Sequence, residues 1–136
     1  MEVSDNTVLN YFRTKQAAYA SPMAVARALK SGAESAVVVV DVRNPVSPIL
    51  TTVEGAIWIP EAQIKDRMNE LPKDKTLVLV CWYTWCSLDT SAAIPLLENG
   101  FQVKELNGGI AAWKTLQLPE MPLQQGSTSE ACSSSC

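Results

Sequence analysis

A run of four consecutive valines, Val37 to Val40, constrains the fold more than any other feature of the chain. A continuous β-branched run suits a strand buried on both faces of a parallel sheet better than an alternating antiparallel strand. Residues 76–81 form a second apolar run, and residues 56–60 and 101–106 are expected to be further short strands. Helical patterns separate these strands, so the sequence predicts an α/β domain with a mainly parallel sheet.

The expected helices are marked by capping residues, by prolines and by apolar residues at helical spacing. Ser21 and Pro22 are typical of a helix start, because serine caps the first turn and proline fits its first position. Pro95 fits a helix only if the regular helix begins near Ser91, which would leave residues 82–90 as an extended loop. The predicted helices cover residues 7–18, the segment from Pro22 to Gly32, the segment from Ile64 to Pro72 and the segment from about Ser91 to Gly100.

The chain of 136 residues has the length of one domain. We assign residues 1–118 to this domain, with the N-terminal helix 7–18 included. After Leu118 the composition changes to Pro, Gln, Gly, Ser and Thr, so residues 119–136 are predicted to be a flexible tail. Cys132 and Cys136 lie in this tail, which has a reach of ~20 Å and would allow them to visit a site on the domain.

Charge and composition exclude several classes of function. The net charge of −3 offers no long-range attraction to phosphate backbones or anionic lipid, so we expect neither nucleic acid nor membrane as a partner. The chain has no histidine, which excludes Ser-His-Asp and Cys-His catalysis and every metal site that needs imidazole. No metal site is predicted. The N-terminus lacks a secretory pattern, so we expect a cytoplasmic protein with reduced thiols.

Two cysteines flank an aromatic segment at the end of the strand 76–81. Cys81 ends the strand, and ligands of open parallel sheets bind beyond the carboxyl ends of strands. Cys86 lies closer to the start of the next helix, where the helix dipole favours a thiolate or a persulfide anion. The alternative for Cys81 is a small buried side chain without a chemical role. The candidate loop residues are Trp82, Tyr83, Thr84, Trp85 and Ser87.

The order of several short motifs resembles a single-domain rhodanese. The motifs run from about Pro22 to Trp113, and none is specific alone, but together they are highly specific. They are Asp41-x-Arg43, Gly55-Ala56-Ile57-x-Ile59-Pro60, the strand-end Cys81, Ala92-Ala93, Leu96-Leu97-x-x-Gly100-Phe101 and Leu106-x-Gly108-Gly109-Ile110-x-x-Trp113. The resemblance implies a rhodanese-like three-layer fold, with a central sheet of five mainly parallel strands and helices on both faces. Its first strand would fall near residues 18–20.

The resemblance also implies a function and the roles of the site residues. Rhodaneses are sulfurtransferases in which a strand-end cysteine holds a sulfane sulfur as a persulfide and passes it to an acceptor. Cys81 matches that nucleophile, and Cys86 is a second candidate or a resolving thiol that forms a disulfide with Cys81 or receives the persulfide. Backbone amides of residues 82–87 would cradle an anion. The partners implied are a sulfur donor and a thiol acceptor, either of which can be another protein, and no cofactor is implied.

The loop departs from the usual rhodanese pattern in length and in charge. It resembles a subgroup with Cys-Trp-x-x-x-Cys, and residues 76–103 contain no Lys or Arg, whereas Asp89 lies nearby. A dianionic donor such as thiosulfate would lack a charged partner, so we expect weak thiosulfate activity and a persulfide carrier loaded by another protein. The alternative is a non-catalytic rhodanese-like module that binds a partner or senses redox state through Cys81 and Cys86.

Other residues of the motifs have structural interpretations. Asp41 and Arg43 are expected to form an ion pair that supports the loop after the first buried strand. The three aromatic residues of the cysteine loop either wall a pocket and dock a partner or pack in part against the core.

Overall fold

The computed structural model describes residues 5–44 and 50–123 and confirms the rhodanese-like α/β fold. The main sheet has five strands in the order β1-β6-β5-β2-β4, and every pairing within it is parallel. These strands are β1 (Tyr19–Ala20), β6 (Gln102–Leu106), β5 (Thr76–Val80), β2 (Val37–Asp41) and β4 (Ile57–Trp58). The carboxyl ends of all five strands therefore lie at one edge, where Cys81 follows β5.

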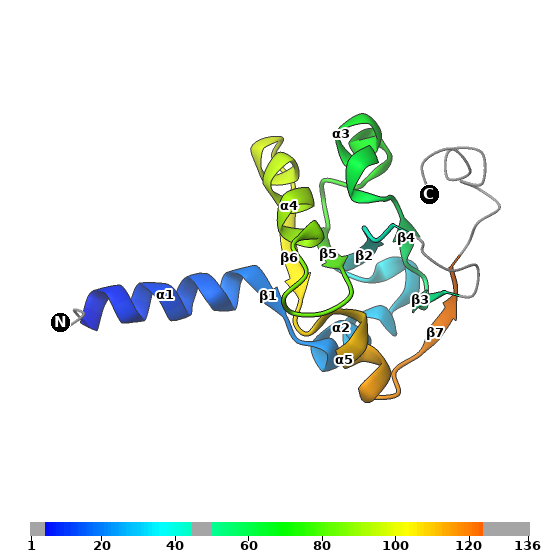
Figure 1. Ribbon diagram of the computed structural model, residues 1–136, viewed down its shortest axis with the longest axis horizontal. Coiled ribbons are helices and arrows are strands. Elements are labelled where there is room, and N and C mark those ends of the chain that lie inside the picture. The colour runs from blue at the N-terminus through cyan, green and yellow to red at the C-terminus, as the bar shows by residue number, and fades with distance from the viewer. Residues whose placement is uncertain (1–4, 45–49, 124–136) are drawn as a thin grey trace.

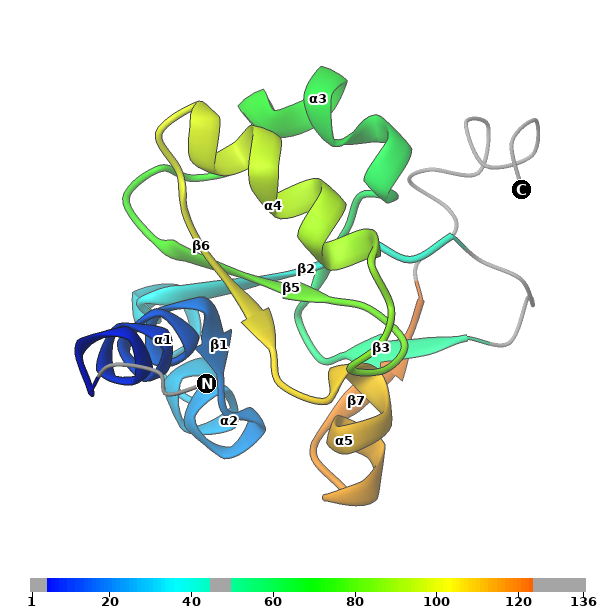
Figure 2. The ribbon, with the colours of Figure 1, turned by 60° about the vertical axis from the view of Figure 1, so that its left-hand side comes forward.

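Helices cover both faces of the sheet, as Figures 1 and 2 show. One layer contains α2 (Pro22–Leu29) and α5 (Gly109–Thr115), and the other contains α3 (Ile64–Arg67) and α4 (Leu88–Glu98). Val39 belongs to the core that includes Trp113 of α5, whereas Val40 belongs to the core that includes Leu96 of α4. Successive side chains of β2 thus enter opposite cores, which explains the run of valines.

The N-terminal helix stands apart from both layers. α1 (Asp5–Ala18) covers the predicted helix 7–18 and extends away from the sheet (Figure 1). It contacts β1 and β6, and Lys104 Nζ donates to the Gln16 carbonyl at 3.5 Å. Its large apolar side chains are exposed: Val8, Leu9, Tyr11 and Phe12. Within the described ranges, no helix is long and apolar enough to span a membrane.

The predicted helix between Ile64 and Pro72 is shorter than expected. The structure divides this segment into a 3-10 turn η2 (Glu61–Gln63), the four residues of α3 and a second turn η3 (Met68–Glu70). A further 3-10 turn, η1 (Gly32–Glu34), precedes β2. Prolines at positions 60 and 72 bound the segment and leave room for few turns, and tight 3-10 turns are common at helix ends.

A second, two-stranded sheet was absent from the prediction. β3 (Thr51–Val53) pairs antiparallel with β7 (Glu120–Pro122). Lys114 Nζ donates to Glu120 Oε1 at 2.7 Å and to Thr51 Oγ1 at 2.6 Å, which ties this sheet to the end of α5.

The predicted domain boundary at residue 118 is wrong by a few residues. The Trp113 indole N–H donates to the Pro119 carbonyl, and the Leu123 N–H donates to the Leu50 carbonyl, both at 2.8 Å. Leu123 is also buried. The folded domain therefore continues through Leu123, because these long-range contacts order a segment whose composition is that of a tail. Residues 124–136 of the predicted tail, with Cys132 and Cys136, lie outside the described residues.

Candidate active site

The structure joins the two predicted cysteines of the loop in a disulfide. Cys81 directly follows β5, and its Cα atom lies 6.3 Å from that of Cys86. Cys81 is fully buried, whereas Cys86 is half-buried. Cys86 is therefore the more exposed residue of the pair while the disulfide is closed. The role of each cysteine in a reaction stays a prediction.

Helix α4 begins closer to the cysteines than Pro95 led us to expect. It starts at Leu88 rather than near Ser91, and Pro95 lies inside it. The Ser91 N–H donates to the Ser87 carbonyl at 2.9 Å, so the first turn closes before the proline is reached. Pro95 has no N–H to donate, but its carbonyl accepts from the Asn99 N–H at 3.2 Å, so the helix continues past the proline. Cys86 thus lies two residues before the positive end of α4.

The start of α5 holds the base of the cysteine loop. The Ile110 N–H donates to the Cys81 carbonyl at 2.9 Å, and the Ala111 N–H donates to the Trp82 carbonyl at 3.2 Å. A Cβ atom at Gly109 would lie 2.8 Å from the Cys81 carbonyl oxygen and 2.8 Å from the carbonyl carbon of Trp82. Gly109 is also left-handed, with φ at 65°. Only glycine allows the two backbones to approach this closely.

We expect Gly109→Ala to destabilise the protein by about 2–4 kcal/mol, because it adds a backbone clash to the cost of the left-handed conformation. Gly32→Ala is the matched control, since Gly32 has φ at 59° but no atom within 4 Å of an added Cβ. It should cost about 1 kcal/mol. Urea unfolding of both variants measures the difference. If both variants lose the same free energy of unfolding, the backbone of Gly109 does not pack tightly against the Cys81 carbonyl.

The predicted ion pair of Asp41 and Arg43 lies directly beneath the loop. Arg43 Nη2 lies 2.7 Å from Asp41 Oδ2, and both side chains are buried. The Thr52 hydroxyl donates to the same carboxylate at 2.6 Å. The Arg43 guanidinium lies 4.5 Å from the centre of the Trp82 ring, a cation–π distance. The pair therefore supports the loop through Trp82.

The three aromatic residues of the loop divide between the two predicted interpretations. Trp82 is half-buried and packs against the core that contains Trp113. Tyr83 and Trp85 are exposed and stack with ring centres 4.7 Å apart, and Trp85 is 81% exposed. Thr84 and Ser87 are also exposed. The stacked pair is thus an exposed aromatic surface that includes Trp85, the residue directly before Cys86.

The charge around the loop disfavours a free anion. The Cys86 N–H already donates to the Tyr83 carbonyl at 3.2 Å, so one amide of the predicted cradle is occupied. Arg43 is brought against the loop from elsewhere in the chain, but Asp41 balances its charge. A dianionic donor would therefore find no unpaired cation among these residues.

A buried carboxyl lies in the first turn of α4. Asp89 is only 6% exposed, and burial together with a hydrogen bond to Glu105 raises the pKa of Asp89 to about 7. The Thr90 hydroxyl donates to Glu105 Oε2 at 2.8 Å. With no histidine in the chain, this carboxyl titrates in the range where histidine ordinarily does.

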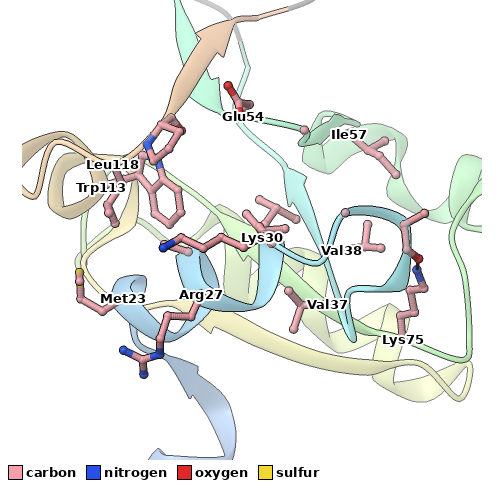
Figure 3. A pocket seen from close by; sticks show the side chains of 17 residues that line it. Met23, Arg27, Lys30, Val37, Val38, Glu54, Ile57, Lys75, Trp113 and Leu118 are labelled. Atoms are coloured by element: carbon pink, nitrogen blue, oxygen red, sulfur yellow. Dashed lines mark hydrogen bonds between the residues drawn. The ribbon is translucent and has the colours of Figure 1, made fainter.

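A cavity of about 680 Å³ lies away from the cysteine loop, between α2, the β2–β4 edge of the sheet and the end of α5 (Figure 3). Val37 and Ile57 form part of its apolar lining, and Lys30 extends toward Trp113 (Figure 3). None of the residues that line this cavity belongs to the 81–87 loop. It is therefore separate from the cysteine site.

Sequence reasoning did not identify three contributors to the site. Gly109 belongs to the motif from Leu106 to Trp113, but the motif does not predict its contact with Cys81, and no sequence pattern marks Thr52 or Glu105. Each acts on a residue far from it in the chain, Gly109 on Cys81, Thr52 on Asp41 and Glu105 on Asp89. The one available signal was the glycine pair at positions 108 and 109, which is typical of a close backbone approach.

Comparison with known proteins supports the same fold and family. The sequence model of the rhodanese-like domain family matches residues 21–116. A sulfurtransferase of Allochromatium vinosum is 34% identical over 84 residues, which cover 61% of this chain and 77% of that protein. The crystal structure of a full-length protein from Lactobacillus plantarum has a TM-score of 0.79 and 30% identity, and the match covers 88% of this chain and 100% of that chain.

A third relative is much longer than this chain. The HTH-type transcriptional regulator Rv0324 of Mycobacterium tuberculosis is 34% identical over 83 residues, which cover 61% of this chain but 37% of the regulator. Domains similar to this one therefore occur within larger proteins of different names.

Proposed function

The chain belongs to the rhodanese-like domain family, and from that premise we propose that it transfers sulfane sulfur through Cys81 as a persulfide relay. The observation that carries the proposal is the position of Cys81 directly after β5, at the carboxyl edge of the parallel sheet. The 34% identity to a protein named sulfurtransferase supports this reaction class.

The proposed reaction has two steps. The Cys81 thiolate attacks the sulfane sulfur of the donor, and the donor residue leaves with the electron pair of the broken bond. An acceptor thiolate then attacks the outer sulfur of the persulfide and restores the Cys81 thiolate. We propose that this takes place in the cytoplasm, with another protein as donor. The start of α4 stabilises the anionic sulfur, and the exposed Tyr83–Trp85 surface suits contact with a protein better than with a small dianion.

Intact mass spectrometry after treatment with inorganic polysulfide tests the assignment of Cys81. All proteins carry Cys132→Ser and Cys136→Ser, so that only the loop thiols react. We expect Cys86→Ser to gain one sulfur, about 32 Da, and Cys81→Ser to gain none. A sulfur adduct on Cys81→Ser together with its absence from Cys86→Ser would reverse the two roles.

We expect the thiosulfate:cyanide activity of the natural chain to be low, because the loop lacks an unpaired cation. A charge-assisted hydrogen bond contributes ~1.5–3 kcal/mol, so Ser91→Arg on the exposed side of α4 should raise the activity by about tenfold or more. An arginine introduced at position 89 would not test the effect, because Asp89 is buried and the new side chain would disturb the fold. Leu97→Arg adds the same charge at the far end of α4 and serves as the control. If Ser91→Arg and Leu97→Arg raise the thiosulfate:cyanide activity equally, the gain does not come from a charge placed beside the cysteine loop.

The second candidate function is a module that binds a partner or senses redox state. The disulfide between Cys81 and Cys86 and the exposed aromatic pair beside it favour this alternative. A loop that oxidises and reduces reversibly, but takes up no sulfur in either single-cysteine variant, would select it over the sulfur relay.

A further inference from the structure

The disulfide of the loop gives the bound sulfur an exit that needs no external acceptor. We propose that Cys86 displaces the sulfane sulfur from Cys81 as hydrosulfide, and that a dithiol then reduces the resulting Cys81–Cys86 disulfide. This inference rests on the proposed function, because it begins from a persulfide on Cys81. It assigns the protein the net reduction of sulfane sulfur to sulfide.

The first step balances within the loop. The Cys86 thiolate attacks the inner sulfur, Cys81 Sγ, and the bond between Sγ and the outer sulfur breaks. The outer sulfur, protonated as the persulfide S–H, leaves with the electron pair as hydrosulfide, so it is reduced while the Cys86 sulfur is oxidised from thiolate to disulfide. Attack on the outer sulfur would instead move the persulfide to Cys86 and release no sulfide.

The arrangement of the two cysteines favours attack on the inner sulfur. Their Cα separation of 6.3 Å lies within the range of directly bonded cysteine pairs, and the structure holds the two residues as the product of this step. Cys86 also lies beside the positive end of α4, which favours its thiolate. Attack within one loop is unimolecular, so it competes well with attack by a dilute external acceptor.

Burial determines where the loop is reduced. Cys81 has no exposed surface, whereas Cys86 is half-buried and follows Trp85, which is 81% exposed. An external thiol therefore attacks Cys86 Sγ, and Cys81 leaves as the thiolate that accepts the next sulfur. The second thiol of the same dithiol resolves the mixed disulfide and restores Cys86. Cytosolic disulfides are usually transient and catalytic, in keeping with this cycle.

Stoichiometric loading with inorganic polysulfide tests the proposal in full-length protein that carries Cys132→Ser and Cys136→Ser. Starting from its reduced form, we expect this parent to release sulfide and to become about 2 Da lighter, which is the mass change of disulfide formation. Cys86→Ser should keep an adduct of about 32 Da and release only the sulfide that loading itself liberates from the polysulfide, one equivalent less than the parent. Ser91→Ala, an exposed substitution in α4, should behave as the parent does. Dithiothreitol should return the parent to its reduced mass and allow a second round.

The outcomes separate this inference from the proposed function. If the parent keeps the sulfur adduct on Cys81, as Cys86→Ser does, the inference is overturned. The proposed sulfur relay through Cys81 is then unaffected. An adduct on Cys86 of the parent also overturns it, because the sulfur has then migrated. If neither the parent nor Cys86→Ser takes up sulfur, the proposed function itself fails.

Discussion

Arg43→Met is expected to lower the free energy of unfolding by about 3–5 kcal/mol, because it leaves a buried carboxylate without its counter-ion. Asp41 and Arg43 are fully buried and share hydrogen bonds of 2.7 to 3.1 Å. Without the guanidinium, the donors to Asp41 among the described residues are the Thr52 hydroxyl and the backbone N–H of residue 43. The Thr51 carbonyl also loses its donor, Arg43 Nη2. Urea unfolding at neutral pH measures the loss.

Arg67→Met provides a matched control for this substitution. Arg67 pairs with Glu70 at 2.9 Å, but Arg67 is only half-buried and Glu70 is exposed, and such solvent-accessible pairs contribute about 0–1 kcal/mol. The double variant Asp41→Asn/Arg43→Met should be more stable than Arg43→Met alone, since no buried charge is left unpaired. If Arg43→Met costs no more than Arg67→Met, the buried pair does not support the fold.

The sequence predicts the main sheet well because its strands are local patterns. Val37 to Val40 become the inner strand β2, and Cys81 follows β5 as the apolar run indicates. The second sheet is different in kind. Thr51 and Thr52 are polar, β7 contains a proline, and the paired residues of the two strands are separated by about half the length of the chain. Neither strand is a recognisable pattern alone, so the boundary after residue 118 was also misplaced.

At the candidate site, the sequence likewise predicts residues that belong to local motifs but not the contacts between segments that are distant in the chain. The resemblance to rhodaneses gives a disulfide with Cys81 as one expected role of Cys86, and the structure contains that disulfide. What holds the loop could not be predicted in this way. The approach of Gly109 to Cys81 and of Arg43 to Trp82 depends on how β5, α5 and the segment after β2 meet in space. Such contacts require the topology of the whole sheet.

Asp89→Asn is expected to stabilise the protein at pH 8 and to have little effect at pH 4. The pKa of Asp89 is raised from 3.8 to about 7, chiefly by burial and then by Glu105. Between these values the folded protein holds a proton that the unfolded chain has released, so stability falls as pH rises from about 4 to 7. One pKa unit corresponds to about 1.4 kcal/mol, which gives a loss on the order of 2–4 kcal/mol. Asparagine carries no charge at either pH and avoids this loss.

Urea unfolding between pH 4 and pH 8 compares this variant with the natural chain and with Asp74→Asn, an exposed control. Parallel pH profiles for Asp89→Asn and the natural chain would show that the buried carboxyl does not titrate as expected. The same variant also bears on sulfur chemistry, because Asp89 lies three residues after Cys86 in the first turn of α4. Above pH 7 its charge opposes the dipole that favours an anionic sulfur. Asp89→Asn should therefore load polysulfide faster than the natural chain at pH 8, and equally fast at pH 6.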